Sequence, residues 1–120
     1  MTKYPIVLVH GICLRESRVF HAFGKIEKVL VAEGCKAYTA GIDAFGSIET
    51  NAEQLKEFVL RILDKTGAEK VNVIAHSKGG LDTKYMLSSL CMADKVASFT
   101  TLCTPHKGSE IATKIWGLPL

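Results

Sequence analysis

Val71-Asn72-Val73-Ile74-Ala75-His76-Ser77-Lys78-Gly79-Gly80 is the stretch that decides the fold of this chain. An apolar, β-prone run stops at a serine between small residues, and a helix-like segment follows at once. This is the layout of a nucleophile elbow, a sharp turn that lifts a serine Oγ above the edge of a parallel sheet. Such a turn brings strand and helix together, so small residues are needed at Ala75 and Gly79, although alanine replaces the commoner glycine at the first. An ordinary turn with Ser77 as a helix N-cap is the alternative.

Apolar runs and helical spacings alternate along the rest of the chain. The continuous aliphatic or β-prone runs predict strands at residues 6–9, 36–40, 71–75 and 96–103. Helical spacing predicts a first helix that Gly34 stops, a second that opens on a capping box at Thr50–Glu53 and stops at Gly67, and a third at residues 79–92. Strands that alternate with helices in this way predict βαβ units and a parallel sheet.

Composition excludes several classes of protein. The 120 residues are enough for one domain, and a formal net charge of +3 that is scattered along the chain does not indicate a nucleic-acid partner. No apolar stretch reaches transmembrane length, and the amino terminus runs straight into the first strand without a signal peptide. We therefore expect a cytoplasmic chain. A secreted mature form expressed from an added methionine is the alternative.

The cysteines do not predict a metal site. Cys13, Cys35, Cys91 and Cys103 lie far apart and form no C-x-x-C pair, which favours free thiols. The chain also lacks a G-x-G-x-x-G motif and a Walker-type lysine loop, so nucleotide binding is disfavoured. We expect neither a metal nor a cofactor.

Three segments should gather beyond the carboxyl ends of the strands, where open α/β sheets bind their ligands. They are residues 10–12, Ser77 and residues 104–109. Acyl transfer needs two backbone N–H donors for the oxyanion, one after the nucleophile and one from the loop after an earlier strand. The amides of Ile12 and Lys78 fill these places. Lys78 should act through its N–H, with its side chain in solvent.

The chain also resembles a known family. The motifs are YPIVLVHG near the start, KVNVIAHSKGGLDTKY around the serine, and ASFTTLCTPHKGSE afterwards. In this order they are similar to the amino-terminal half of the bacterial true lipases of the α/β-hydrolase superfamily, which include the Pseudomonas, Burkholderia and Proteus enzymes. The resemblance covers nearly the whole chain. It implies that Ser77 is the nucleophile and that Ile12 and Lys78 provide the oxyanion-hole amides.

The departure from this family lies after the fourth strand. An α/β-hydrolase places its triad in the order serine, acid, histidine, with the last two on loops after later strands. Asp94 precedes the fourth strand, and eight extended residues would put it roughly 26 Å from the site. His106 follows that strand; the resemblance gives its segment a structural or site-lining part, and a makeshift base is the alternative. We interpret residues 1–120 as the amino-terminal part of a single α/β-hydrolase domain without its carboxy-terminal strands.

These observations predict a truncated α/β-hydrolase with a four-stranded parallel sheet and helices on both faces. The expected spatial order of the strands is second, first, third, fourth. The expected function is hydrolysis of carboxylic esters, of lipids in particular, through an acyl-enzyme on Ser77. One alternative is a catalytically incomplete fragment or binding module without the triad acid and histidine, and another is a thioesterase or acyltransferase on the same scaffold.

The expected partner is a lipid or small ester substrate. The fourth strand, residues 96–103, is β-prone and uncharged, and no later strand follows to cover it. An edge of this kind offers unpaired N–H and C=O groups to another chain. We therefore expect self-association, or pairing with a complementing carboxy-terminal fragment, along this edge.

Overall fold

The computed structural model of this chain describes residues 4–10, 18–42, 46–76 and 78–102. Within these ranges, strands and helices alternate as the apolar runs predicted. In chain order the elements are β1 (Ile6–Val9), α1 (Arg18–Ala32), β2 (Ala37–Thr39), α2 (Ile48–Thr66), β3 (Val71–His76), α3 (Lys78–Ser88), the short 3-10 helix η1 (Ala93–Lys95) and β4 (Val96–Leu102).

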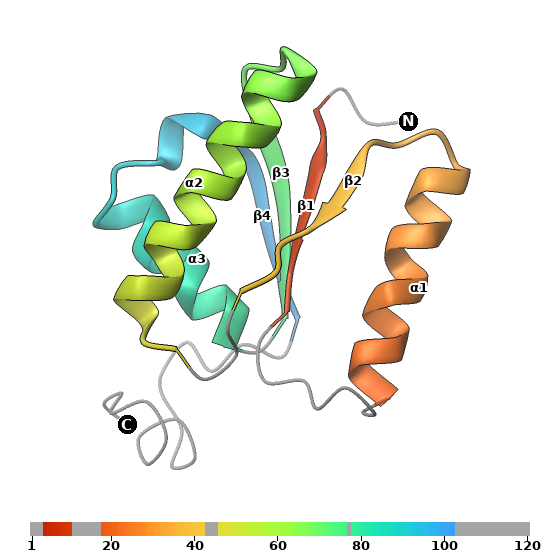
Figure 1. Cartoon of the computed structure of the whole chain (residues 1–120), viewed down its shortest axis with the longest axis horizontal. Helices are drawn as coiled ribbons and strands as arrows, with labels where there is room; N and C mark the ends of the chain where they lie inside the picture. The colour runs from red at the N-terminus through yellow and green to blue at the C-terminus, as the bar shows by residue number, and fades with distance from the viewer. Residues whose placement is uncertain (1–3, 11–17, 43–45, 77, 103–120) are drawn as a thin grey trace.

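The four strands form one parallel sheet in the order β2-β1-β3-β4. This is the predicted order. All four carboxyl ends therefore lie along the same edge of the sheet, below the strands in Figure 1. The residues that follow β1, β2 and β3 meet at this edge, which is where open α/β sheets place their sites.

Helices cover both faces of the sheet, with α1 on one face and with α2 and α3 on the other (Figure 1). Alternating residues of β1 serve the two sides, as strand geometry requires. Val7 and Val9 belong to the larger apolar cluster, together with buried residues of α2 and α3. Ile6 and Leu8 belong to a smaller cluster with the half-buried Ile26 of α1. We call these two sides the α2–α3 side and the α1 side.

The caps of α2 differ in part from the sequence prediction. The N-cap is Ser47, three residues before the predicted capping box, and its Oγ accepts the backbone N–H of Thr50 at 3.1 Å. The prediction of a box at Thr50–Glu53 was therefore wrong. The predicted stop at Gly67 is confirmed: its φ of 73° is left-handed, and its N–H donates to the Leu63 carbonyl at 2.9 Å.

The third helix is shorter than predicted, because α3 ends at Ser88. The chain turns back soon afterwards, and Cys91 has a left-handed φ of 57° that a right-handed helix cannot include. Asp94 then lies in η1, directly before β4. The predicted place of Asp94, at the amino end of the fourth strand, is confirmed.

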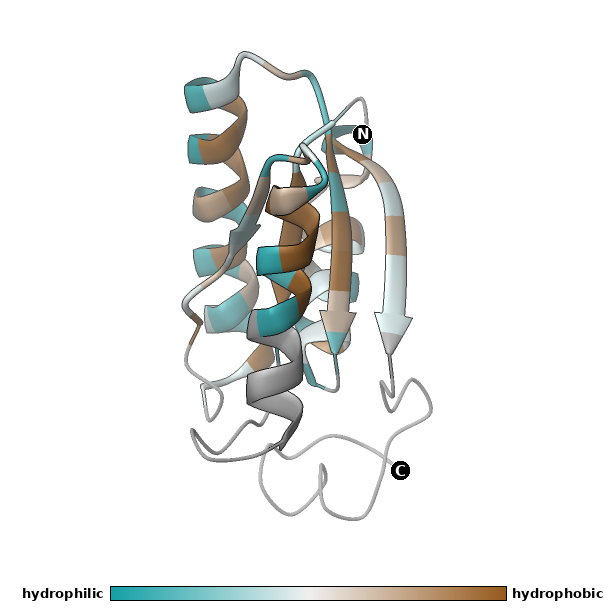
Figure 2. Cartoon of the chain, turned by 90° about the vertical axis from the view of Figure 1, so that its right-hand side faces the viewer, coloured by the Kyte–Doolittle hydropathy of each residue, from teal (hydrophilic) through white to brown (hydrophobic). Residues whose placement is uncertain are grey.

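The fourth strand lies at one end of the sheet and is more open than the central strands. Ala97, Ser98 and Thr100 are exposed, whereas Val71 and Val73 of the neighbouring β3 are fully buried. Figure 2 shows the same contrast in composition, since β4 is paler and less hydrophobic than β3. Among the described residues, β4 pairs with β3 alone.

Candidate active site

The junction between β3 and α3 has the spacing of the predicted elbow. The strand ends at His76 and the helix begins at Lys78, so one residue, Ser77, separates them. Ser77 and Ile12 lie outside the described residues, as does His106. Their assignments as nucleophile, oxyanion donor and alternative base therefore stay predictions. Lys78, the other predicted oxyanion donor, opens α3 at the carboxyl edge of the sheet.

Gly79 is the residue that allows α3 to start so close to the sheet. A Cβ atom at this position would lie 2.6 Å from the carbonyl oxygen of Val9, a distance that real Cβ atoms essentially never show, and 3.0 Å from its carbonyl carbon. The helix start therefore packs directly on the end of β1, and the predicted need for a small residue at Gly79 has a steric cause. Ala75, at the carboxyl end of β3, is fully buried.

The Lys78 side chain is buried, which corrects the expectation that it lies in solvent. Only 1% of it is exposed, and its Nζ lies 3.0 Å from Oδ1 of Asp82, one turn further along α3. Asn51 of α2 donates its Nδ2–H to the other carboxyl oxygen of Asp82 at 3.3 Å. These three buried residues form what we call the Lys78–Asp82–Asn51 cluster. It joins the start of α3 to the first turns of α2.

The charge of this cluster is costly to bury. Burial raises the pKa of Asp82 to about 6, and the Lys78 ammonium and the two hydrogen bonds offset that rise only in part. At pH 7 the carboxyl group is therefore mostly ionised and paired with Lys78. A modest fall in pH is enough to protonate it.

Two histidines lie side by side at the same edge. His10 directly follows β1 and His76 ends β3, one position beyond the paired residues Val9 and Ala75. Burial lowers the pKa of His76, and the neighbouring His10 lowers it further. The His76 imidazole is consequently neutral near pH 7. Neutrality suits an ordering role for His76 beside the elbow.

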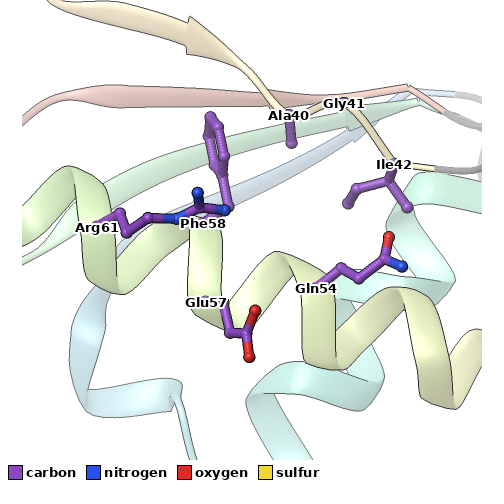
Figure 3. A pocket seen from close by; sticks show the side chains of 7 residues that line it. All are labelled: Ala40, Gly41, Ile42, Gln54, Glu57, Phe58 and Arg61. Carbon is purple, nitrogen blue, oxygen red and sulfur yellow. The ribbon is translucent and has the colours of Figure 1, made fainter.

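A groove opens at the carboxyl end of β2, between the segment 40–42 and α2 (Figure 3). Its volume is about 330 Å³, at the lower end of the range for small-molecule sites. The ring of Phe58 rises from α2 toward the strands and forms an apolar wall, while Glu57 points away from the sheet. Lys78, the described member of the predicted catalytic set, is not among the described residues that line this groove. Its lining is Ala40, Gly41, Ile42, Gln54, Glu57, Phe58 and Arg61.

The described ranges, residues 4–10, 18–42, 46–76 and 78–102, contain neither a metal-ligand group nor a membrane span. In these ranges, no three histidine, cysteine or acidic side chains gather as a metal ion would require. No helix in this part of the chain is long and apolar enough to cross a bilayer. Of the cysteines described, Cys35 and Cys91 are free thiols, as expected.

The strand order β2-β1-β3-β4, and a helix that begins one residue after β3, fit the α/β-hydrolase fold. Comparison with solved structures agrees. A Bacillus licheniformis lipase, BlEst2 in its mature form, superposes with a TM-score of 0.75 at 27% sequence identity, over 98% of this chain and 51% of that one. Its propeptide form gives a TM-score of 0.76 at 29% identity, over 93% of this chain and 24% of that one.

The chain belongs to the family described as "Putative serine esterase (DUF676)", whose model matches residues 5–120. It is 40% identical over 116 residues to a triacylglycerol lipase of Pseudarthrobacter phenanthrenivorans, covering 92% of this chain and 36% of that protein. It is also 40% identical over 121 residues to a triacylglycerol lipase of Vibrio cholerae, covering 98% of this chain and 37% of that protein. The chain thus spans about a third of the length of these curated lipases.

Sequence reasoning missed the roles of Asp82 and Asn51. The local signal was present, because Lys78 and Asp82 are four residues apart and therefore lie on the same side of a helix. The second part of the signal was not local. Asn51 lies 31 residues before Asp82 in the chain, and only the packing of α2 on α3 brings their side chains together.

Proposed function

We propose that this chain carries the nucleophile and oxyanion-hole amides of a serine hydrolase that cleaves carboxylic esters of lipids. Ser77 Oγ attacks the ester carbonyl, and the backbone N–H groups of Lys78 and Ile12 stabilise the oxyanion that forms. The alcohol then leaves with a proton, and water hydrolyses the acyl-enzyme to release the acid and restore the serine.

The close approach of Gly79 to Val9 is the observation that carries this proposal. A strand, a single residue and a helix start pressed onto the neighbouring strand are the elements of a nucleophile elbow. An ordinary strand-to-helix turn with Ser77 as N-cap does not require the helix to start so close to β1. The steric need for glycine therefore favours the catalytic interpretation.

The lipid substrate rests on the relatives. Proteins named triacylglycerol lipase match this chain over nearly its full length, but the match spans about a third of theirs. The rest of each relative has no counterpart in these 120 residues. We therefore extend lipid-ester hydrolysis to this chain as a proposal and assign it no acyl-chain length.

A second candidate function, a catalytically incomplete part of a lipase, is favoured by the positions of two acids. Among residues 78–102, the acidic side chains are Asp82 and Asp94. Asp82 is committed to the buried pair with Lys78, and Asp94 lies at the amino end of β4, across the sheet from the site. The triad acid and base must then come from outside the described residues. We infer that residues 1–120 form the amino-terminal part of one α/β-hydrolase domain.

Hydrolysis of p-nitrophenyl butyrate by the 120-residue chain tests both candidates. With an incomplete triad, we expect a slow reaction, at most on the order of 10³–10⁴ over water, because only the oxyanion hole and substrate binding then act. A turnover typical of a lipase that Ser77→Ala abolishes, and that Ser89→Ala at an exposed serine just beyond α3 leaves unchanged, would mean that the triad is complete within these residues. A turnover of that size that Ser77→Ala leaves unchanged would contradict the proposed nucleophile.

The open edge of β4 supports a proposal about partners. We infer that another β-strand, from a complementing carboxy-terminal segment or from a second copy, pairs with this edge. Sedimentation at low micromolar concentration should show self-association of the 120-residue chain. Thr100→Lys, which places a charge on this exposed strand, should reduce it. A monomer with a cooperative melt would contradict the proposal.

A further inference from the structure

The Lys78–Asp82–Asn51 cluster includes Lys78, the residue that opens α3. Its three side chains are among the few buried polar or charged ones of the described residues, with 1%, 2% and 1% exposed for Lys78, Asp82 and Asn51. The backbone N–H of Lys78 is a candidate oxyanion donor, and its side chain belongs to this cluster. One residue therefore links the expected reaction centre to the packing of α2 on α3.

The cluster is a costly way to fill this space. Lys78 places a cation in the first turn of a helix, where the helix dipole is already positive. The order of the pair, lysine before acid, is also the less favourable one on a helix. Apolar side chains of similar size often replace a buried ion pair without loss of stability, or with a gain. Stability alone does not account for this choice of residues.

The cluster provides directional hydrogen bonds, which apolar side chains cannot form. One oxygen of the Asp82 carboxyl accepts a hydrogen bond from Lys78 at 3.0 Å, and the other accepts one from Asn51 at 3.3 Å. These bonds join the two helices at one defined place. The Thr83 hydroxyl adds a bond to the Gly79 carbonyl at 2.8 Å within the same turn. Hydrogen bonds have preferred distances and angles, whereas apolar contacts permit sliding.

We propose that Lys78, Asp82 and Asn51 are positioning residues, which fix the start of α3 against α2 and thereby hold the Lys78 N–H where the oxyanion forms. The catalytic part of this inference rests on the proposed function of Ser77. The mechanical part, a rigid first turn of α3, does not. The two parts can therefore fail separately.

The test is a triple variant, Asn51→Leu with Lys78→Met and Asp82→Leu, which replaces the cluster by apolar side chains of similar size. Its unfolding free energy at pH 7 should match or exceed that of the unchanged chain. The control is Lys84→Met, an exposed lysine on the same helix. For each chain, ¹⁵N relaxation reports the order of the amides at residues 78–80. The rate of Ser77 phosphonylation by a short-chain alkyl fluorophosphonate reports the reactivity of the candidate active site.

We expect the triple variant to lose order at residues 78–80, while amides in the middle of α2 keep theirs. Its phosphonylation rate should fall about tenfold to a hundredfold, because a small misplacement of a catalytic group has effects of this size. Lys84→Met should change neither quantity. A stable triple variant with unchanged order and an unchanged rate would overturn the proposal, as would a loss of rate that only follows the unfolded fraction.

Two further outcomes are also decisive. If the triple variant does not fold, Asn51→Leu alone removes one bond of the cluster and leaves the ion pair in place. It should then lower both the order at residues 78–80 and the rate severalfold, and no change in either would overturn the proposal. If the unchanged chain is not phosphonylated at Ser77, these residues alone do not activate the serine. The relaxation data then decide whether the cluster holds α3.

Discussion

The two sides of the sheet differ in how completely they are closed. On the α2–α3 side, Val9, Val59 and Val73 are fully buried, and the helix start at Gly79 packs against the end of β1. On the α1 side, the outer face of α1 exposes 59% of Val29 and 54% of Val31. The exposed strand β4 completes the contrast at the edge of the sheet.

This difference separates two tasks of the chain. The closed α2–α3 side contains the larger apolar cluster, the strand–helix junction and the Lys78–Asp82–Asn51 cluster, so stability and the candidate site depend on the same packing. The strand β4, at one end of the described sheet, has more exposed residues than β3. It is the part of the sheet where we propose that another strand pairs.

The largest effect is expected from Gly79→Ala. The added Cβ would meet the backbone of Val9, which cannot give way without moving β1. Even after the helix propensity gained by alanine, we expect a loss of about 2–3 kcal/mol in unfolding free energy, measured in urea. The matched control is Gly41→Ala, where a Cβ meets nothing within 4 Å and where we expect a change within about 0.5 kcal/mol. Equal losses in both variants would remove the steric argument for the elbow.

A smaller effect is expected from pH, through Asp82. Its pKa in the folded chain is about 6, above the ordinary value of 3.8, so the folded state holds a proton that the unfolded state releases between these values. This contribution to stability is full below the unfolded value and is lost as the pH rises through 6, a change on the order of 2 kcal/mol. In Asp82→Asn that component should be missing from the difference between pH 4 and pH 7. If the stability of Asp82→Asn depends on pH in the same way as that of the wild-type chain, the raised pKa of Asp82 is contradicted.

Alanine substitutions at two valines, one on each side of the sheet, compare the two sides directly. The smallest effect of all is expected at Val31 on the α1 side. Val59→Ala on α2 removes two methyl groups from a fully buried position and should cost about 2 kcal/mol. Val31→Ala on α1 removes the same groups from a side chain that is 54% exposed and should change stability by less than about 0.5 kcal/mol. Thermal unfolding of both variants measures the contrast. Similar losses would mean that the outer face of α1 is covered in solution.

Much of this architecture could be predicted from the sequence, because local signals agreed with the tertiary fold. Aliphatic runs located β1 and β3, and the alternation of strands and helices predicted a parallel sheet. The resemblance to the lipases implied the order β2-β1-β3-β4. Gly67 was predicted as a stop and has the left-handed backbone that a helix end requires. The sequence predicted that position 79 needs a small residue, and the close approach of Gly79 to Val9 explains that need.

The errors arose where several residues compete for one role or where distant segments meet. Ser47 and Thr50 are both good N-cap residues, and the Ser47 hydroxyl captures the Thr50 N–H, so α2 begins earlier than the pattern at Thr50 suggested. Lys78 was expected in solvent, as most lysines are. Its burial depends on Asp82 and on Asn51 of another helix, and no local pattern contains that contact.

The most direct test of the central claim is the site of covalent modification. In the reaction with a fluorophosphonate, a serine oxygen forms a bond to phosphorus and fluoride leaves with the proton as HF. Tryptic cleavage after Lys70 and Lys78 yields the peptide of residues 71–78, in which Ser77 is the only serine. We predict that the phosphonate mass appears on this peptide and disappears in Ser77→Ala. A folded chain that is modified at other serines and not at Ser77 would contradict the assignment of Ser77 as the nucleophile.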